Sequence, residues 1–157
     1  MTPKVLLKEL VAVVEDCTKN LRFVDSFGDA IPISVFEQNL PVKQNDSDDE
    51  PYPYIIVRVV EGKLNPNEGS RIIHVWIVIG IVENDLKNQG GEEVSMIEEI
   101  IGMRLCEQNV LQHFRLAGPI AWGIEDTDTY PYFYGGMEMD FETHQVQNAD
   151  RIAERYT

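Results

Sequence analysis

Residues 72–82 read IIHVWIVIGIV and form the most continuously apolar stretch of the chain. Successive side chains of a β-strand point to opposite faces of the sheet. One face of this segment therefore carries isoleucine or valine at positions 73, 75, 77, 79 and 81. The other carries Ile72, His74, Trp76, Val78 and Val82. Since both faces are largely apolar, the stretch predicts a central strand with both faces covered.

The tripeptide Tyr-Pro-Tyr occurs twice, at residues 52–54 and 130–132, and each copy leads into a β-patterned segment. Proline has a fixed φ and no N–H to donate, so it suits the first residue of a strand. Both copies are therefore interpreted as strand entrances, to strands at 54–60 and 133–141. A further strand is predicted at 120–124.

Turn residues at Gly62 and at 65–69 (NPNEG) separate the strand at 54–60 from the one at 72–82. This spacing predicts a hairpin with a long loop. Two shorter strands, 21–24 and 33–36, are expected around a turn at Gly28 and Asp29.

Two segments have helical periodicity. In the first, Pro3 follows a candidate N-cap, and apolar residues recur at 7, 10, 11 and 14 until a stop near Asn20. The second opens at Glu92 and Glu93, after a Gly90-Gly91 pair interpreted as a flexible hinge. Its inner stripe comprises Val94, Ile97, Ile101 and Leu105.

These elements predict one α+β domain spanning residues 1–157. Its sheet is mostly antiparallel, with about four main strands and two main helices packed on one face. The acidic segment 43–50 is interpreted as a flexible loop, and a short amphipathic helix is expected at 149–156. With 43% hydrophobic residues, the chain has enough apolar material for a single core.

The chain carries 27 acidic and 13 basic residues, a formal net charge of -14. The basic residues are scattered singly, which argues against sequence-specific binding of DNA or RNA. No apolar run reaches the roughly 20 residues that a membrane helix needs, so no membrane association is expected. Cys17 and Cys106 have no metal-site or redox spacing and are predicted to be reduced, buried thiols near helix ends.

Catalytic motifs are missing from the sequence. The three histidines lack partners at metal-ligand spacing, and Gly-x-Ser-x-Gly does not occur. The run 46–50 lacks the glycine and distant glutamate of an EF-hand. The acidic residues at 125, 126 and 128 are typical of a turn. We therefore expect a protein that is not an enzyme and uses no cofactor or metal.

The second face of the predicted sheet mixes aromatic residues, arginine and a few charges, which is typical of a protein–protein interface. The alternative is that the short strands near residues 21–37 fold over this face and bury it. The candidate interface residues are Tyr54, Arg58, His74, Trp76, Tyr132 and Tyr134.

A resemblance to a known family rests on three segments. They are 52–62 (YPYIIVRVVEG), the strand ending at 79–81 (IGI) before GEEV at 91–94, and PIAW at 119–122 with DTYPYFYGGME at 128–138. Their order resembles the tail terminator, or tail-completion, proteins of long-tailed phages and prophages. The likeness spans about residues 52–141.

This resemblance implies a homo-oligomeric ring, expected to be a hexamer, that caps the tail tube, stops its polymerisation and docks to the head-completion or connector protein. Its expected partners are further copies of itself, the tail tube protein and that connector. Its expected location is the virion tail, after assembly in the host cytoplasm. An acidic wall would also retain passing DNA less. Two alternatives stay open: another head-tail connector or tube component, and a small cytosolic enzyme or ligand-binding domain.

Overall fold

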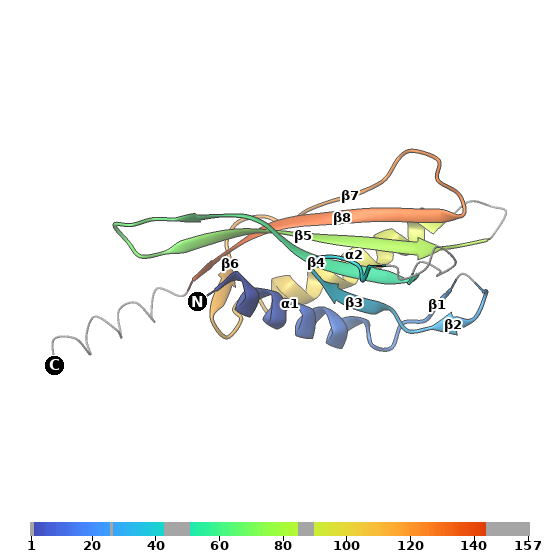
Figure 1. Ribbon diagram of the computed structural model, residues 1–157, viewed down its shortest axis with the longest axis horizontal. Helices are drawn as coiled ribbons and strands as arrows, with labels where there is room; N and C mark the ends of the chain where they lie inside the picture. The colour runs from blue at the N-terminus through green and yellow to red at the C-terminus, as the bar shows by residue number, and fades with distance from the viewer. Residues whose placement is uncertain (1, 26, 43–50, 85–89, 144–157) are drawn as a thin grey trace.

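The computed structural model describes residues 2–25, 27–42, 51–84 and 90–143. It consists of one long twisted sheet with two helices packed against one face (Figure 1). The elements in chain order are α1 (Pro3–Thr18), β1 (Phe23–Val24), β2 (Ala30–Ile31), β3 (Ser34–Glu37), β4 (Tyr54–Leu64), β5 (Arg71–Val82), α2 (Gly90–Glu107), β6 (Phe114–Leu116), β7 (Ala121–Ile124) and β8 (Tyr132–Thr143).

The main sheet has six strands in the order β3-β4-β5-β8-β6, and β7 also pairs with β8. All neighbours are antiparallel except β3 and β4, which run parallel. The predicted α+β fold and the β4–β5 hairpin are therefore confirmed. β6 was not predicted, because three residues show no usable alternation.

The predicted turn at Gly28 and Asp29 is confirmed, but the strand that follows it and pairs with β1 is β2 and not residues 33–36. β1 pairs with β2 around Gly28, whose φ of 86° suits a residue without a side chain. Residues 33–36 lie mostly within β3, which extends the main sheet beside β4. A parallel pairing between distant segments has no local sequence signal. The Gly28 turn instead joins the two short strands next to it, β1 and β2.

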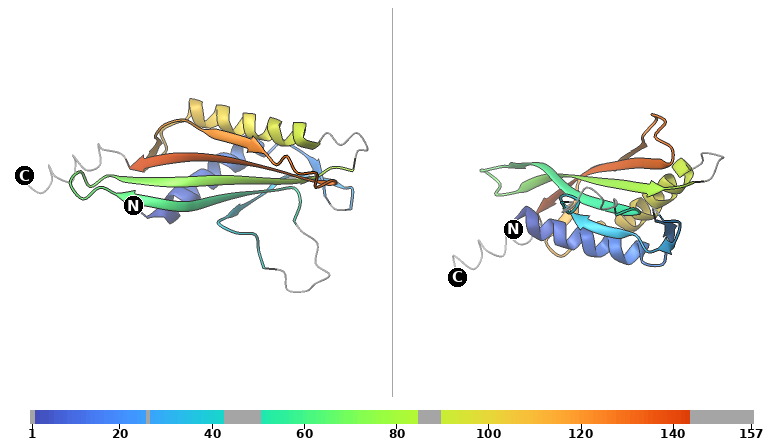
Figure 2. Two further views of the ribbon diagram at one scale, coloured as in Figure 1. Left: turned by 90° about the horizontal axis from the view of Figure 1, so that it is seen from above. Right: turned by 45° about the vertical axis from the view of Figure 1, so that its right-hand side comes forward.

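The core lies between the sheet and the two helices. The odd-numbered side of β5, residues 73–81, is buried there as predicted. The inner stripe of α2 is buried as well, at Val94, Ile97, Ile101 and Leu105. α1 contributes Leu6, Leu7, Leu10, Val13 and Val14. The left view of Figure 2 shows α2 running along the sheet and α1 passing obliquely to the strands.

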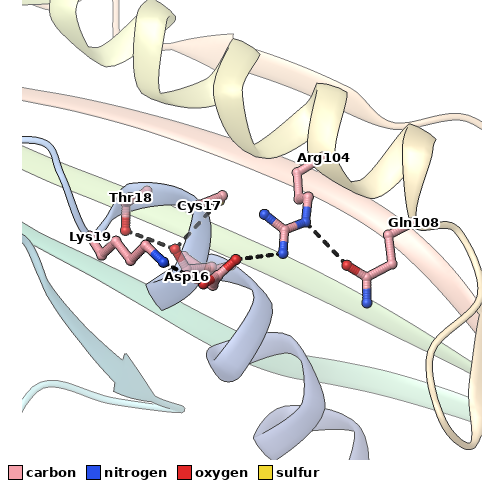
Figure 3. A network of polar contacts seen from close by, with 7 residues as sticks. Asp16, Cys17, Thr18, Lys19, Arg104 and Gln108 are labelled. Atoms are coloured by element: carbon pink, nitrogen blue, oxygen red, sulfur yellow. Dashed lines mark hydrogen bonds and ion pairs between the residues drawn. The ribbon is translucent and has the colours of Figure 1, made fainter.

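A polar contact joins the two helices close to the C-terminal end of each (Figure 3). Arg104 of α2 donates a hydrogen bond of 2.6 Å to Asp16 of α1, and a second to Gln108, the residue that follows α2. Lys19 also pairs with Asp16, at 3.1 Å. Arg104, and then Lys19, lower the pKa of Asp16. Because these groups are exposed, we assign the helix packing mainly to the buried apolar stripes.

The two Tyr-Pro-Tyr segments meet at one end of the sheet. Each has a cis Tyr-Pro peptide bond and leads into β4 or β8. The ring centroids of Tyr52 and Tyr132 are 5.0 Å apart, and the hydroxyl groups of Tyr52 and Tyr134 share a hydrogen bond. β5 runs between β4 and β8, so these rings bridge over it.

Gly80 of β5 makes that bridge possible. A Cβ atom at this position would lie 2.4 Å from the ring of Tyr54, which therefore lies directly over the glycine backbone. The two tripeptides contribute Tyr52, Tyr54 and Tyr132, and Tyr134 of β8 joins them in one aromatic cluster. We call it the tyrosine cluster.

Three other expectations have different outcomes. Gly90 and Gly91 are the first two residues of α2, and the interpretation as a hinge was wrong, because the ring of Phe133 packs where a Cβ of Gly90 would stand. Cys106 is exposed, although both thiols are free as expected. The predicted loop 43–50 and helix 149–156 lie outside the described residues. Within the described chain, no helix has the length and apolarity to span a membrane.

Candidate interaction surface

The sheet face turned away from the helices carries all six candidate interface residues. The register places Arg58, Trp76 and Glu138 side by side across β4, β5 and β8. In the same way, Tyr54 and Tyr134 flank Gly80, and His74 lies beside Asp140. We call this side of the sheet the outer face.

One end of the outer face is covered. Tyr54 and Ile56 are each 7% exposed, because Tyr52, Phe36 and Leu40 pack over them. The alternative that the short N-terminal segments fold over this face therefore holds for this end. Tyr54 is not available on the surface, Tyr134 is half-buried and Tyr132 is exposed at the rim.

The other end is open, and Trp76 lies at its centre with 41% of its surface exposed. Beside it, a hollow of about 320 Å³ extends over Gly136 and Gly123, where no side chain rises from the sheet. Arg58 and Glu138 flank Trp76 in the register. An exposed indole between charged groups and next to a hollow is the arrangement expected of a binding anchor.

His74 connects the charged and aromatic groups of this open end. Its Nδ1 lies 2.7 Å from an Asp140 oxygen, and its Nε2 lies 3.3 Å from a Glu138 oxygen. The indole Nε1–H of Trp76 also points at Nε2, at 3.1 Å. A neutral imidazole with its proton on Nδ1 accepts from Trp76, whereas a protonated imidazole donates to Glu138 instead. The two contacts at Nε2 therefore exclude one another.

Replacing His74 by glutamine is expected to remove a pH-dependent part of the stability. The hydrogen bond with Asp140 raises the pKa of His74 above 6.5, against the effect of desolvation. Protonated His74 thus stabilises the fold below about pH 6.5, and this contribution is lost as pH rises through the higher folded pKa. In urea unfolding, His74→Gln should lower the free energy of unfolding more at about pH 5.5 than at about pH 8.5.

The carboxylates that face this imidazole are Asp140 and Glu138 on β8 and Glu61 on β4. A matched control is Trp76→Phe, which removes the indole N–H and leaves the titrating group in place. This variant should keep the pH dependence of the wild type. A deficit of His74→Gln that is the same at both pH values would contradict the assignment.

A second surface is the far end of the β4–β5 hairpin, residues 60–72, which we call the arm. Figure 1 shows it projecting past α1 and α2. Leu64 is 60% exposed, and Val60 and Ile72 are exposed as well. A bulge between Val59 and Glu61 separates the arm from the rest of the sheet. β8 pairs with β5 as far as Ile72, so only the tip of the hairpin, from Leu64 to Arg71, extends beyond a third strand. Exposed apolar residues on such an extension favour contact with another surface.

A third surface is a groove between α2 and β7, with a cavity of about 370 Å³. Met103 and Trp122 are exposed apolar residues in its lining, and Cys106 lies there too. Glu98 is almost fully buried at this groove, and its Oε2 accepts a hydrogen bond from the backbone N–H of Gly123 at 3.2 Å. Among the described residues, its Oε1 has no hydrogen-bond partner. We call this surface the α2–β7 groove.

Burial raises the pKa of Glu98 to about 7, and the Gly123 N–H only partly opposes this shift. A carboxyl group in such a site is protonated for much of the neutral range.

Sequence analysis did not single out Glu98, the groove or the tyrosine cluster. In the described part of the chain, no group of three or more His, Cys, Asp or Glu residues has the geometry to hold a metal ion.

The fold and these surfaces define the class of the molecule as an α+β domain with three exposed, partly apolar surfaces. A scan of the chain against protein-family models finds no match, and a search of curated protein sequences finds none either.

Proposed function

We propose that the chain is a structural virion protein of the tail-terminator type, a non-enzymatic subunit that assembles into a ring at the end of a phage tail tube. The observation that carries the proposal is the open end of the outer face, where Trp76 stands exposed beside a hollow. The order of segments that resembles the terminator family supports it.

The proposed ring is a homo-oligomer, a hexamer by that resemblance, which stops polymerisation of the tube and docks to the head connector. A closed ring needs two different surfaces on each subunit, because every copy contacts the next in the same sense. It needs a further surface for the tube. The proposal therefore needs three surfaces, and the subunit offers the outer face, the arm and the α2–β7 groove. We assign the outer face to the tube.

The test is native mass spectrometry over a range of concentrations and salt, followed by electron microscopy with tail tubes. The subunit mass of 17.9 kDa makes the number of copies easy to read. A discrete ring-sized species that decorates tube ends would support the proposal. A protein that stays monomeric and leaves tube ends bare would contradict it.

Replacing Trp76 by aspartate is expected to abolish binding to tube ends while the subunit stays folded. The indole is partly exposed, so its loss removes little core packing, but a new charge next to Glu138 and Asp140 opposes burial of this surface. Circular dichroism would check the fold, and co-sedimentation with tubes would measure binding.

The matched control is Phe27→Asp, since Phe27 is an aromatic residue that is 76% exposed on the β1–β2 turn, away from the open end. This variant should bind tubes as the wild type does. Full tube binding by a folded Trp76→Asp subunit would remove the outer face from the proposal. Trp76→Ala would serve if the aspartate prevents folding.

A further inference from the structure

The arm and the α2–β7 groove lie too far apart for one chain to join them. In the register, Trp122 of β7 aligns with Met137 of β8 and Ile77 of β5, whereas Leu64 aligns with Arg71. Arg71 precedes Ile77 by six residues, which is about 20 Å along a strand. The groove and the arm are also separated across the sheet by β8 and β5. The two surfaces therefore do not meet within one chain, and a contact between them requires a second copy.

The two surfaces complement each other in polarity. Leu64 and Arg71 are directly opposite in the hairpin, so their side chains share one face of the arm. That face pairs one exposed apolar side chain with one positive charge. The groove presents apolar Met103, Ile120 and Trp122 together with the carboxyl groups of Glu98 and Glu99, and its lining contains no lysine or arginine.

The groove also has an edge that is open to a neighbour. Within the residues that the structure describes, β7 pairs only with β8, and all four of its residues are exposed. Gly123 of this strand donates to Oε2 of Glu98, and the buried Oε1 beside Gly135 has no hydrogen-bond partner among the described residues. A short open edge next to an apolar wall and a half-satisfied carboxyl group favours docking of another protein segment.

We propose that the arm of one copy docks in the α2–β7 groove of a second copy, with Leu64 packed against Met103 and Trp122 and with Arg71 near Glu98 and Glu99. This assignment rests on the proposed ring and names the contact between its subunits. The contact is heterologous, because each copy gives its arm to one neighbour and its groove to the other. Repeated around an axis, it closes a ring and leaves the outer face free for the tube.

A mixing experiment tests the contact by native mass spectrometry. Leu64→Asp spoils only the arm and Trp122→Asp spoils only the groove, and both residues are more than half exposed, so both variants should fold. Each variant alone is expected to remain monomeric. When they are mixed, the intact arm of Trp122→Asp meets the intact groove of Leu64→Asp. The mixture should therefore give a dimer with one copy of each and no ring.

Rings formed by either single variant would overturn the arm-groove contact while the proposed ring itself stands. A wild-type chain that forms no ring would instead count against the proposed function, and a cross-link then decides whether the contact exists. Cys106 is exposed in the groove, so a thiol introduced by Leu64→Cys should come close to it in a neighbour. A short bismaleimide should join the two thiols.

The cross-link is made in a Cys17→Ser background at high protein concentration. A covalent species of twice the subunit mass is expected, and further substitution Cys106→Ser should abolish it. Lys8→Cys, on the exposed side of α1, provides a control for random collision. A yield for Leu64→Cys no higher than that for Lys8→Cys would overturn the proposed contact, whatever the state of the ring.

Discussion

Replacing Gly135 by alanine is expected to lower the free energy of unfolding by about 1–3 kcal/mol. Gly135 lies in β8, where α2 packs closely on the sheet. An added Cβ would stand 2.4 Å from Cγ1 of Val94, 2.9 Å from Oε1 of Glu98 and 3.1 Å from the carbonyl oxygen of Gly123. Val94 is fully buried, so relief requires α2 or β7 to move. Urea unfolding followed by circular dichroism would measure the loss.

Gly136 provides the matched control, because it is the next residue of the same strand and faces the opposite side. The nearest atom to its added Cβ would be the carbonyl oxygen of Ile77, at 3.8 Å, which is ordinary contact. Gly136→Ala is therefore expected to change the stability by no more than about 0.5 kcal/mol. Equal losses for the two variants would show that the cost comes from the glycine backbone and not from the approach of α2.

Sequence periodicity predicted the parts of the fold that are long and amphipathic. The alternation in residues 72–82 assigned the buried side of β5, and the spacing of Val94, Ile97, Ile101 and Leu105 assigned the buried side of α2. In both cases, burial of one face against the core fixes the pattern of residues, so the pattern can be read back. The same alternation also predicted which face of β4, β5 and β8 carries the candidate interface residues.

Features that depend on contacts between distant segments were missed or left open. The parallel pairing of β3 with β4 was missed, and the cover over Tyr54 was given only as an alternative, because both bring short segments onto the sheet and neither has a periodic signal. Glu98 is different, because a signal was available. It follows Val94 by four residues and precedes Ile101 by three, which places it on the buried stripe of α2. A carboxylate on that stripe was a reason to look for an unusual site.

Replacing Glu98 by glutamine is expected to stabilise the protein at about pH 8 by about 1–3 kcal/mol. Burial raises the pKa of Glu98 to about 7, from 4.5 in the unfolded chain. Between these values the folded state keeps a proton that the unfolded state has lost, so the wild type loses stability as pH rises. Above about pH 7 the fold holds a buried carboxylate, and one of its oxygens has no hydrogen-bond partner in the part of the chain that the structure describes. Glutamine keeps an acceptor for the Gly123 N–H without that charge.

The pH dependence separates charge from shape. At about pH 4.5 the wild-type side chain is protonated in the folded state and resembles glutamine, so the gain of Glu98→Gln should vanish there. Glu99→Gln is the control, because Glu99 is the next residue of α2 and is exposed, and its effect should stay within about 0.5 kcal/mol at both pH values. Urea unfolding at the two pH values measures both variants. If Glu98→Gln gave the same gain at both, packing and not ionisation would be the cause, and the groove would have no buried charge to offer a neighbouring arm.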